Sequence, residues 1–192
     1  MYKIDFSKPI HIHFIGIGGI SMSGLAEILH EEGFTISGSD SKESDLTKTL
    51  AAKGIKVIYG QSADNITSDI DLVVYTAAIH ESNPEFAAAK AAGIPMLTRA
   101  ELLGQIMDNY DYSIAVAGTH GKTTTTSMIS EILLAAQTDP TISVGGILSS
   151  IHGNLRVGDS EYFISEACEY TNSFLNFRPR YSICLLYTSP SP

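Results

Sequence analysis

The sequence predicts an α/β fold of two consecutive regions, a first domain built on a parallel sheet and the start of a second α/β domain. Short apolar runs alternate with stretches of helical periodicity along the 192 residues. A glycine cluster directly follows the first apolar run, and a second glycine-rich loop follows a later one. Repeated alternation of strands and helices is typical of a parallel sheet with helices on both faces.

The elements of the first region follow from residue type and spacing. A strand is expected at residues 10–15, because IHIHFI is rich in β-forming residues and runs into glycines. The next segment has Met22, Leu25, Ile28 and Leu29 at helical spacing, which predicts a helix. Further strands are expected at 34–37, 55–58 and 72–75, and further helices at 85–92 and 100–107.

The second region begins where the composition changes. Residues 108–112 (DNYDY) are polar, and a new strand is expected at 114–117. We therefore place the domain boundary between residues 109 and 110. A glycine-rich turn and a helix with an apolar face come next, and a later strand at 162–165 ends on Glu166. The residues of that apolar face are Met128, Ile129, Ile132, Leu133 and Ala136.

Composition and charge argue against several classes of protein. Twelve Lys and Arg against 21 Asp and Glu give a net charge of −9, which argues against a general binder of nucleic acid or of an anionic membrane. No apolar run approaches the ~18 residues that a membrane span needs, and the start MYKIDFSKP lacks the pattern of a signal peptide. Cys168 and Cys184 are too few for a disulfide framework, so a cytoplasmic location is expected.

The segment AVAGTHGKTTTT follows a buried strand and opens a helix, which is the context of a phosphate-binding loop. Gly118 and Gly121 would let backbone N–H groups turn toward phosphate oxygens. Lys122 would reach the β- and γ-phosphates, and the hydroxyl of Thr123 would coordinate Mg²⁺. The general pattern GxxxxGK[ST] has glycine where this chain has Val116, so the loop fits the narrower form G-T-x-G-K-T. The loop predicts binding of a nucleoside triphosphate, and a plain glycine turn with a surface lysine is the alternative.

A carboxylate at the end of a strand supports this site. In such folds an apolar strand of the same sheet often ends in an acid that contacts Mg²⁺. Glu166 occupies this place, and Glu169, three residues later, could share the role. A solvated acid at the end of a strand is the alternative for both.

The first glycine cluster, GIGGISMSG, predicts an anion site in a Rossmann-like domain. Gly16 and Gly18 match the start of GxGxxG, but the third glycine position holds Ser21. A strand, a glycine turn and a helix together can bind a diphosphate, and Asp40 lies where such domains keep a ribose-binding acid. Taken alone these residues suggest NAD, and a tight turn without a ligand is the alternative.

Four residues that could carry chemistry are predicted to be structural. His11 and His13 occupy alternate positions of the first strand. His120 lies inside the phosphate loop and is expected to shape it rather than act as a general base. Cys168 is expected to be a buried, unreactive thiol.

The two glycine loops occur together with further motifs that closely resemble the Mur ligase family, and within it the ligases that add L-alanine. The similarity covers about residues 10–183, and the motifs together are highly specific. They are HFIGIGGISMSGLAEIL, SGSD, TAAI, RAELL, AGTHGKTTTT and SEACEYTNSFLNFRP.

The resemblance implies two ligand sites. The first domain, residues 1–109, would bind the UDP of UDP-N-acetylmuramate rather than NAD. The residues implied for this site are Gly16, Ile17, Gly18, Gly19, Ile20, Ser39, Asp40, Thr76, Ala77 and Ala78. The central domain would bind ATP through Gly118, Thr119, His120, Gly121, Lys122, Thr123 and Thr124, and Mg²⁺ through Thr123 and Glu166. The implied catalytic residues are Lys122, Thr123 and Glu166.

The chemistry implied by the resemblance is amide formation. ATP would phosphorylate the muramate carboxylate, the amine of L-alanine would attack the acyl phosphate, and phosphate would leave. Three alternatives stay open: a ligase that recycles murein tripeptide, a nucleotide-binding dehydrogenase suggested by the first loop alone, and a non-catalytic protein that binds a UDP-sugar.

The resemblance stops at about Ile183. Family members continue into a metal-binding histidine and a third domain, so residues 110–183 are expected to be an incomplete ATP-binding domain. We expect the 192-residue chain to have little or no ligase activity alone. Residues 184–192 (CLLYTSPSP) look like a translated library adaptor and are expected to be a non-native tail.

Overall fold

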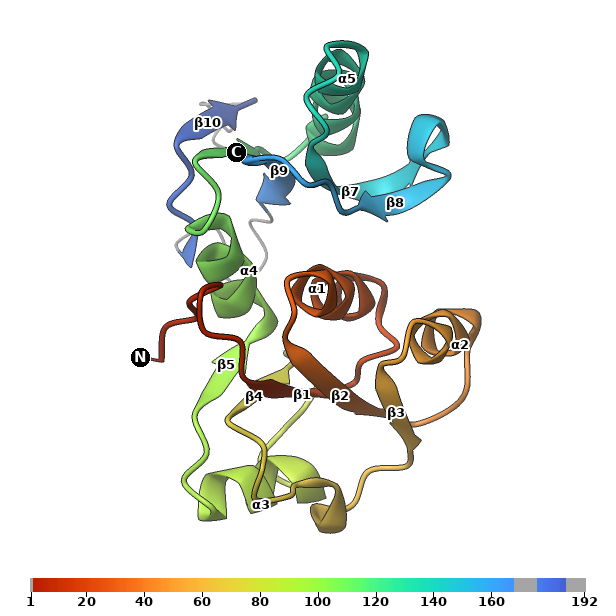
Figure 1. Cartoon of the computed structure of the whole chain (residues 1–192), viewed down its shortest axis with the longest axis vertical. Coiled ribbons are helices and arrows are strands. Elements are labelled where there is room, and N and C mark those ends of the chain that lie inside the picture. Colours follow the sequence, from red (N-terminus) through yellow and green to blue (C-terminus); the bar gives the residue numbers. More distant parts are fainter. Residues whose placement is uncertain (1, 168–175, 186–192) are drawn as a thin grey trace, which may run out of the picture. The chain divides into compact units, whose positions relative to one another are not determined.

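A computed structural model describes residues 2–167 and 176–185 of the chain. They form two compact units, which divide between Leu102 and Leu103 inside a helix, and each unit has its own five-stranded sheet (Figure 1). The predicted α/β class is confirmed. The domain boundary between residues 109 and 110 stays a prediction. Within the described part of the chain, no helix combines the length and the apolar character needed to cross a bilayer.

The first unit is a parallel sheet in the order β3-β2-β1-β4-β5. Figure 1 shows helices α1 and α2 over one face of this sheet and α3 over the other, as the alternating pattern predicts. Because β1 lies between β2 and β4, the order of the strands reverses beside β1, and ligands of such sheets bind at the carboxyl ends of strands at this point. The elements are β1 (His11–Ile15), α1 (Ile20–Glu31), β2 (Thr35–Asp40), α2 (Asp45–Ala52), β3 (Lys56–Tyr59), η1 (Ala63–Asn65), β4 (Leu72–Tyr75), α3 (Pro84–Ala91), β5 (Met96–Thr98) and α4 (Arg99–Met107), which continues into the second unit.

Buried central strands explain which elements the sequence predicts well. Strands covered on both faces read as continuous apolar runs, and β4 is such a run, so the expected strand at 72–75 agrees with β4. In the first unit α2, β5 and the short 3-10 helix η1 were not expected. The start of α2 has a recognisable signal, because Ser44 caps the helix and exchanges hydrogen bonds with Thr47 in a capping box. The strand β5 has only three residues and pairs with β4 alone.

The contact between β2 and the turn after β1 requires a glycine at position 38. A Cβ on Gly38 would lie 2.7 Å from both Cβ and Cδ1 of Ile17 and 2.8 Å from the carbonyl oxygen of Phe14. Since Ile17 and Phe14 are wholly buried, neither can move aside without shifting the core. We expect Gly38→Ala to lower the free energy of unfolding by about 3 kcal/mol, measured by urea denaturation. Gly153→Ala is the control, because its Cβ would meet no atom closer than 3.9 Å. Equal stability of the two variants would contradict this account.

The second unit has a mixed sheet in the order β10-β6-β9-β7-β8. Four strands are parallel, whereas β8 is antiparallel to β7. This agrees with the α/β fold expected for the region, and the antiparallel edge is a feature that the sequence did not indicate. The physical reason is the short link between β7 and β8, which allows a hairpin but is too short for a parallel crossover. The elements are β6 (Tyr112–Ala117), α5 (Lys122–Ala135), β7 (Thr141–Leu148), η2 (Ser149–Ile151), β8 (Gly153–Arg156), β9 (Tyr162–Ala167) and β10 (Tyr181–Cys184).

The face of α5 that packs inward is not centred on its apolar residues. Met128 and Ile132 are 61% and 66% exposed, whereas Thr126 and Ser130 are wholly buried. The hydroxyl of Ser130 donates to the carbonyl oxygen of Thr126 at 2.8 Å, so its burial leaves no hydrogen bond unmade. Small side chains here let the helix approach the sheet closely, and the glycine loop before it fixes which residues face inward. Apolar periodicity alone therefore misjudges this helix.

Candidate functional site

The glycine turn of the first unit joins β1 to α1 and is held by the end of β2. The N–H groups of Gly16 and Ile17 both donate to the carbonyl oxygen of Ser39 at 2.9 Å. The N–H of Gly18 donates to Oδ2 of Asp40 at 2.8 Å. The side chain of Ile17 is wholly buried. These amides are therefore already bonded within the protein and fix the course of the turn.

The N-terminus of α1 is the part of this turn that can receive an anion. Gly19 is the N-cap, and no described side chain accepts from the first amides of the helix. Ile20, the first residue of the helix, is 67% exposed. Free amides of a first helical turn attract anions, and the helix dipole adds to this attraction.

An arginine that sequence reasoning did not assign to the site reaches the same helix end. Nη1 of Arg99 donates to Oγ of Ser21 at 3.0 Å. Arg99 directly follows β5 and is the first residue of α4. The hydroxyl and the N–H of Thr98 donate to Oε2 of Glu101 at 2.8 and 2.7 Å, which fixes the start of α4. The guanidinium group is thus placed beside the first turn of α1. Arg99 opens the motif RAELL, but nothing in that motif indicates a contact with the first turn of α1.

The turn after β4 lies next to the glycine turn. The N–H of Ile79 donates to the carbonyl oxygen of Thr76 at 3.0 Å, and the N–H of Ala78 donates to Oγ1 of Thr76 at 3.3 Å. A Cβ on Gly16 would lie 3.9 Å from Cγ2 of Thr76. The structure therefore brings together the predicted residues that follow β1, β2 and β4. Ala77 lies in the same turn, between Thr76 and Ala78.

The second glycine loop joins β6 to α5. Gly121, the N-cap of α5, has φ +82°, a conformation that favours glycine. Nζ of Lys122 donates to the carbonyl oxygen of Gly118 at 2.6 Å, so the side chain folds back over the loop. The other predicted residues of the loop, Thr119, His120, Thr123 and Thr124, are exposed. No described side chain caps α5.

Two glycines of β7 lie between the residues predicted to hold Mg²⁺. The N–H of Gly145 donates to Oε1 of Glu166 at 2.7 Å, and a Cβ on Gly145 would lie 2.9 Å from Oε2 of that carboxylate. A Cβ on Gly146 would lie 3.1 Å from Cγ2 of Thr123. Both glycines thus make room for Glu166 and Thr123. The sequence analysis assigned neither glycine to the site, although adjacent glycines in an apolar strand signal a close approach.

The donor set fits a magnesium ion that is shared with a phosphate. A hydroxyl and a carboxylate oxygen are hard ligands, and Mg²⁺ usually takes one or two protein oxygens together with water and phosphate oxygens. Among residues 2–167 and 176–185, no three His, Cys, Asp or Glu side chains cluster to form a metal cage by themselves. Glu169 and Cys168 lie outside the described residues, as do residues 186–192 of the expected tail.

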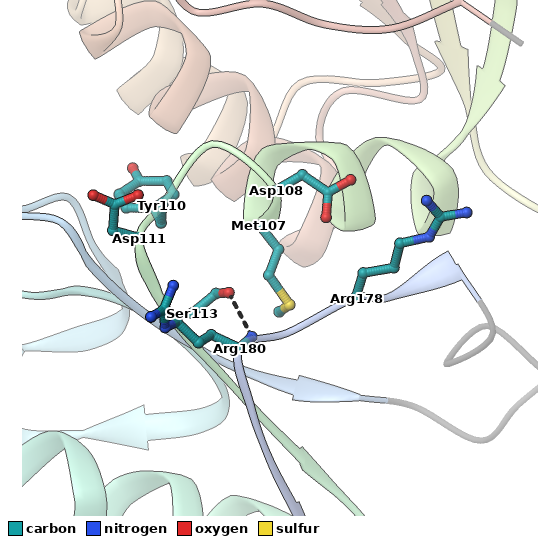
Figure 2. Close-up of a pocket in the computed structure, with 7 residues that line it drawn as sticks. All are labelled: Met107, Asp108, Tyr110, Asp111, Ser113, Arg178 and Arg180. Carbon is teal, nitrogen blue, oxygen red and sulfur yellow. Dashed lines mark hydrogen bonds between the residues drawn. The ribbon is translucent and has the colours of Figure 1, made fainter.

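A separate pocket of about 340 Å³ opens at the other end of β6 (Figure 2). Ser113, near the start of β6, accepts a hydrogen bond from the N–H of Arg180 at 3.1 Å. The pocket contains none of the residues predicted from the sequence. It is lined by Met107, Asp108, Tyr110, Asp111, Ser113, Arg178 and Arg180.

Comparisons with known proteins agree with the two-unit structure. Residues 11–111 match the model described as "Mur ligase family, catalytic domain", and residues 116–184 match the Mur ligase middle domain. Curated proteins named UDP-N-acetylmuramate–L-alanine ligase from Agathobacter rectalis and Lachnospira eligens are 98% and 72% identical to the chain over 185 residues. These residues are 96% of this chain and 40% of each relative, so the chain spans about 40% of the length of these relatives.

Solved structures show the same relationship. The UDP-N-acetylmuramate-alanine ligase of Thermotoga maritima is 35% identical, with a TM-score of 0.79 over 91% of this chain and 41% of that one. A murein peptide ligase from Psychrobacter arcticus is 28% identical, with a TM-score of 0.81 over 91% of this chain and 42% of that one. The family model covers more than half of the chain. The chain therefore belongs to the Mur ligase family.

Proposed function

We propose that this chain forms the UDP-sugar-binding and ATP-binding part of a ligase that joins L-alanine to UDP-N-acetylmuramate. The observation that carries the proposal is the 98% identity to a protein of that name over 185 residues, which include both glycine loops. The structure supports it because each loop ends at an uncapped helix N-terminus of more than two turns. UDP-sugars and ATP are cytoplasmic metabolites, so we propose a cytoplasmic location.

In this proposal the first unit holds the UDP group. The diphosphate would lie at the N-terminus of α1, where the amides after Gly19 and the guanidinium of Arg99 carry positive charge. Oδ2 of Asp40 holds the turn, and Oδ1, which accepts from the hydroxyl of Ser41 at 3.4 Å, would accept from a ribose hydroxyl. Thr76 and its turn would line the nucleotide.

The second unit would hold ATP and Mg²⁺. Lys122 and the loop residues Gly118–Thr124 would bind the phosphates, while Thr123 and Glu166 would hold the ion. A bound Mg²⁺ would neutralise charge on the phosphoryl group during its transfer. The muramate carboxylate would attack the γ-phosphorus and release ADP, and the amine of L-alanine would then attack the acyl carbon and release phosphate. The protein would chiefly position the two reactants in line.

Binding experiments on the 192-residue chain test the proposal. Isothermal titration calorimetry is expected to show one site for UDP-N-acetylmuramate and a second, independent site for MgATP. Binding of NADH in place of the UDP-sugar would instead support the dehydrogenase alternative. The murein-tripeptide alternative is favoured by the likeness to two solved structures. They are the murein peptide ligase at 28% identity and the UDP-N-acetylmuramate:L-alanyl-γ-D-glutamyl-meso-diaminopimelate ligase of Neisseria meningitides at 31%. Comparing tripeptide with L-alanine as acceptor in the full-length protein separates this alternative from the proposed function.

Arg99→Ala is expected to weaken UDP-N-acetylmuramate binding about tenfold, because it removes a charge-assisted contact to the diphosphate. Affinity for MgATP is expected to stay unchanged. Lys90→Ala is the control of equal charge change, since Lys90 pairs with Glu81 on the surface at 2.7 Å. If both variants weaken binding equally, only the net charge matters and the placement of Arg99 in the site is wrong.

A further inference from the structure

A buried polar cluster lies behind the glycine turn of the first unit. Glu85, near the start of α3, is wholly buried. The hydroxyl of Ser39 donates to Oε2 of Glu85 at 2.5 Å, and Nδ2 of Asn65 donates to Oε1 at 2.5 Å. Nε2 of His13 lies 4.0 Å from Oε2 of the same carboxylate. The four side chains come from β1, β2, η1 and α3, so the cluster ties two central strands to the elements that cover one face of the sheet.

The cluster is linked to the turn through Ser39. The side chain of Ser39 is held by Glu85, and its carbonyl oxygen accepts from both Gly16 and Ile17 at 2.9 Å. A residue fixed at both its hydroxyl and its carbonyl group has little freedom to move. The position of the turn therefore depends on the carboxylate behind it.

The hydrogen bonds that Glu85 accepts favour the charged form of its carboxyl group in spite of its burial. Burial by itself raises the pKa of Glu85, but the interactions with His13, Ser39 and Asn65 outweigh burial and hold the pKa below its ordinary value. A buried charge is costly unless it is matched by opposite charge or by several hydrogen bonds. The side chain facing Glu85 that can take up a positive charge is that of His13, with Nε2 at 4.0 Å from Oε2.

The hydrogen bonds along β1 and β2 show how His13 can carry that charge. Nδ1 of His11 lies 2.9 Å from Asp69, Nε2 of His11 lies 2.8 Å from Oγ of Ser37, and the same Oγ lies 2.9 Å from Nδ1 of His13. The carboxylate of Asp69 can only accept, so Nδ1 of His11 carries a hydrogen. If both histidines are neutral, Ser37 donates to His11 and accepts from His13. The bare Nε2 of His13 then faces the negative charge of Glu85.

One additional proton removes this repulsion. When it resides on His13, an N–H faces the carboxylate of Glu85. When it resides on His11, Ser37 turns to donate to Nδ1 of His13, and Nε2 of His13 again carries a hydrogen. In both arrangements one positive charge on the two histidines balances the negative charge of Glu85. Nε2 of His13 is one of two buried side-chain polar atoms in the described chain without a hydrogen-bond partner, which agrees with an interaction that is ionic.

We propose that Glu85 is a positioning residue for the UDP-binding turn, acting through Ser39, and that its charge is balanced by one proton shared along His11, Ser37 and His13. The inference rests on the proposed function of the first unit. It assigns Glu85 and His13 a role in binding without placing either of them in contact with the ligand.

The proposal predicts a pH dependence with a defined sign. Loss of the shared proton as pH rises places a lone pair against Glu85, loosens Ser39 and weakens UDP-sugar binding. Two further carboxylates contact His11, at the outer end of the series His11–Ser37–His13. Asp69 accepts from Nδ1 of His11 at 2.9 Å, and Asp71 accepts from the backbone N–H of His11 at 2.9 Å. A hydrogen bond from the side chain of Thr67 holds the pKa of Asp69 below its ordinary value. UDP-N-acetylglucosamine is a suitable probe, because its diphosphate diester does not titrate near neutral pH.

The test compares Glu85→Gln with the matched control Glu81→Gln in the 192-residue chain. Glu81 is exposed and pairs with Lys90. We expect Glu85→Gln to weaken binding of UDP-N-acetylglucosamine about tenfold at pH 6.5 and to remove most of its pH dependence. Glu81→Gln is expected to retain the affinity and the pH dependence of the parent chain. Hydrogen exchange is expected to quicken at the amides of Gly16 and Ile17 more than elsewhere in the sheet.

The possible outcomes separate this inference from the proposed function. Failure of the parent chain to bind any UDP-sugar would overturn the proposed function, and the inference with it. Equal affinity and equal pH dependence of the parent chain and Glu85→Gln would overturn the inference alone. Uniformly faster exchange over the whole first unit would show a merely structural role and overturn it as well. If Glu85→Gln does not fold, Ser39→Ala decides, because it keeps the carbonyl group and is expected to quicken exchange at the same two amides.

Discussion

Replacing Lys122 by alanine is expected to lower the affinity for MgATP about a hundredfold, or ~2.7 kcal/mol, and to leave UDP-sugar binding unchanged. Lys122 is the only lysine in residues 103–192. In the structure its Nζ donates to the carbonyl oxygen of Gly118, so it already lies over the loop in which phosphates would bind. A protein of net charge −9 supplies no general attraction for ATP, so the loss of this cation is not compensated elsewhere.

The measurement is titration calorimetry of the variant with MgATP and, separately, with UDP-N-acetylmuramate. Lys90→Ala is the control, because it makes the same change of charge on the surface of the first unit. The melting temperature of Lys122→Ala is expected to stay close to that of the parent chain, since the side chain is not part of a core. Full MgATP affinity in Lys122→Ala would mean that the second glycine loop is not the triphosphate site.

Gly18→Ala is expected to reduce UDP-sugar affinity at least a hundredfold, or ~2.7 kcal/mol, with MgATP binding retained. A Cβ at this position would lie 2.7 Å from Oδ2 of Asp40 and 2.8 Å from Cγ2 of Thr47. The carboxylate of Asp40 could rotate away, but only by giving up its bond to the N–H of Gly18. Thr47 is wholly buried, and its capping box with Ser44 fixes it at the start of α2. The methyl group cannot move aside, so the glycine turn itself must move.

Gly19→Ala is the matched comparison for this variant. Its Cβ would meet no atom closer than 3.6 Å, and the backbone at Gly19 is an ordinary extended conformation. We therefore expect a much smaller loss of affinity than for Gly18→Ala. Similar losses for both variants would show that any added methyl group blocks the ligand, and that the contacts with Asp40 and Thr47 do not matter. Circular dichroism of both variants checks that the first unit stays folded.

The sequence predicts the parts of the site that depend on local order along the chain. A strand, a glycine turn and a helix are contiguous, so the loops at Gly16 and Lys122 can be recognised without knowledge of the fold. Arg99 and Glu85 could not be found in this way. Arg99 contacts Ser21, which lies 78 residues earlier in the sequence, and Glu85 contacts Ser39, which lies 46 residues earlier. One contact is at α1 and the other at α3, and these helices cover opposite faces of the sheet (Figure 1).

The fold shows the same division. The buried strand β4 was expected at its observed bounds because a continuous apolar run has few other solutions. The inward face of α5 was misjudged because Thr126 and Ser130 are polar by type yet buried. The hairpin of β7 and β8 was missed because Gly145 and Gly146 interrupt the apolar pattern of β7. These glycines leave space for the side chains of Glu166 and Thr123.

The two loops differ in how ready they are for a ligand. The amides of the first turn already donate to Ser39 and Asp40, so this turn is preorganised, and binding there is expected to lose little conformational entropy. In the second loop the ammonium group of Lys122 must first leave the carbonyl oxygen of Gly118. Nucleotide entry at the second loop thus includes an exchange of hydrogen bonds that the first turn does not need. We expect the UDP-sugar to associate faster than ATP with this chain, a difference that stopped-flow kinetics would resolve.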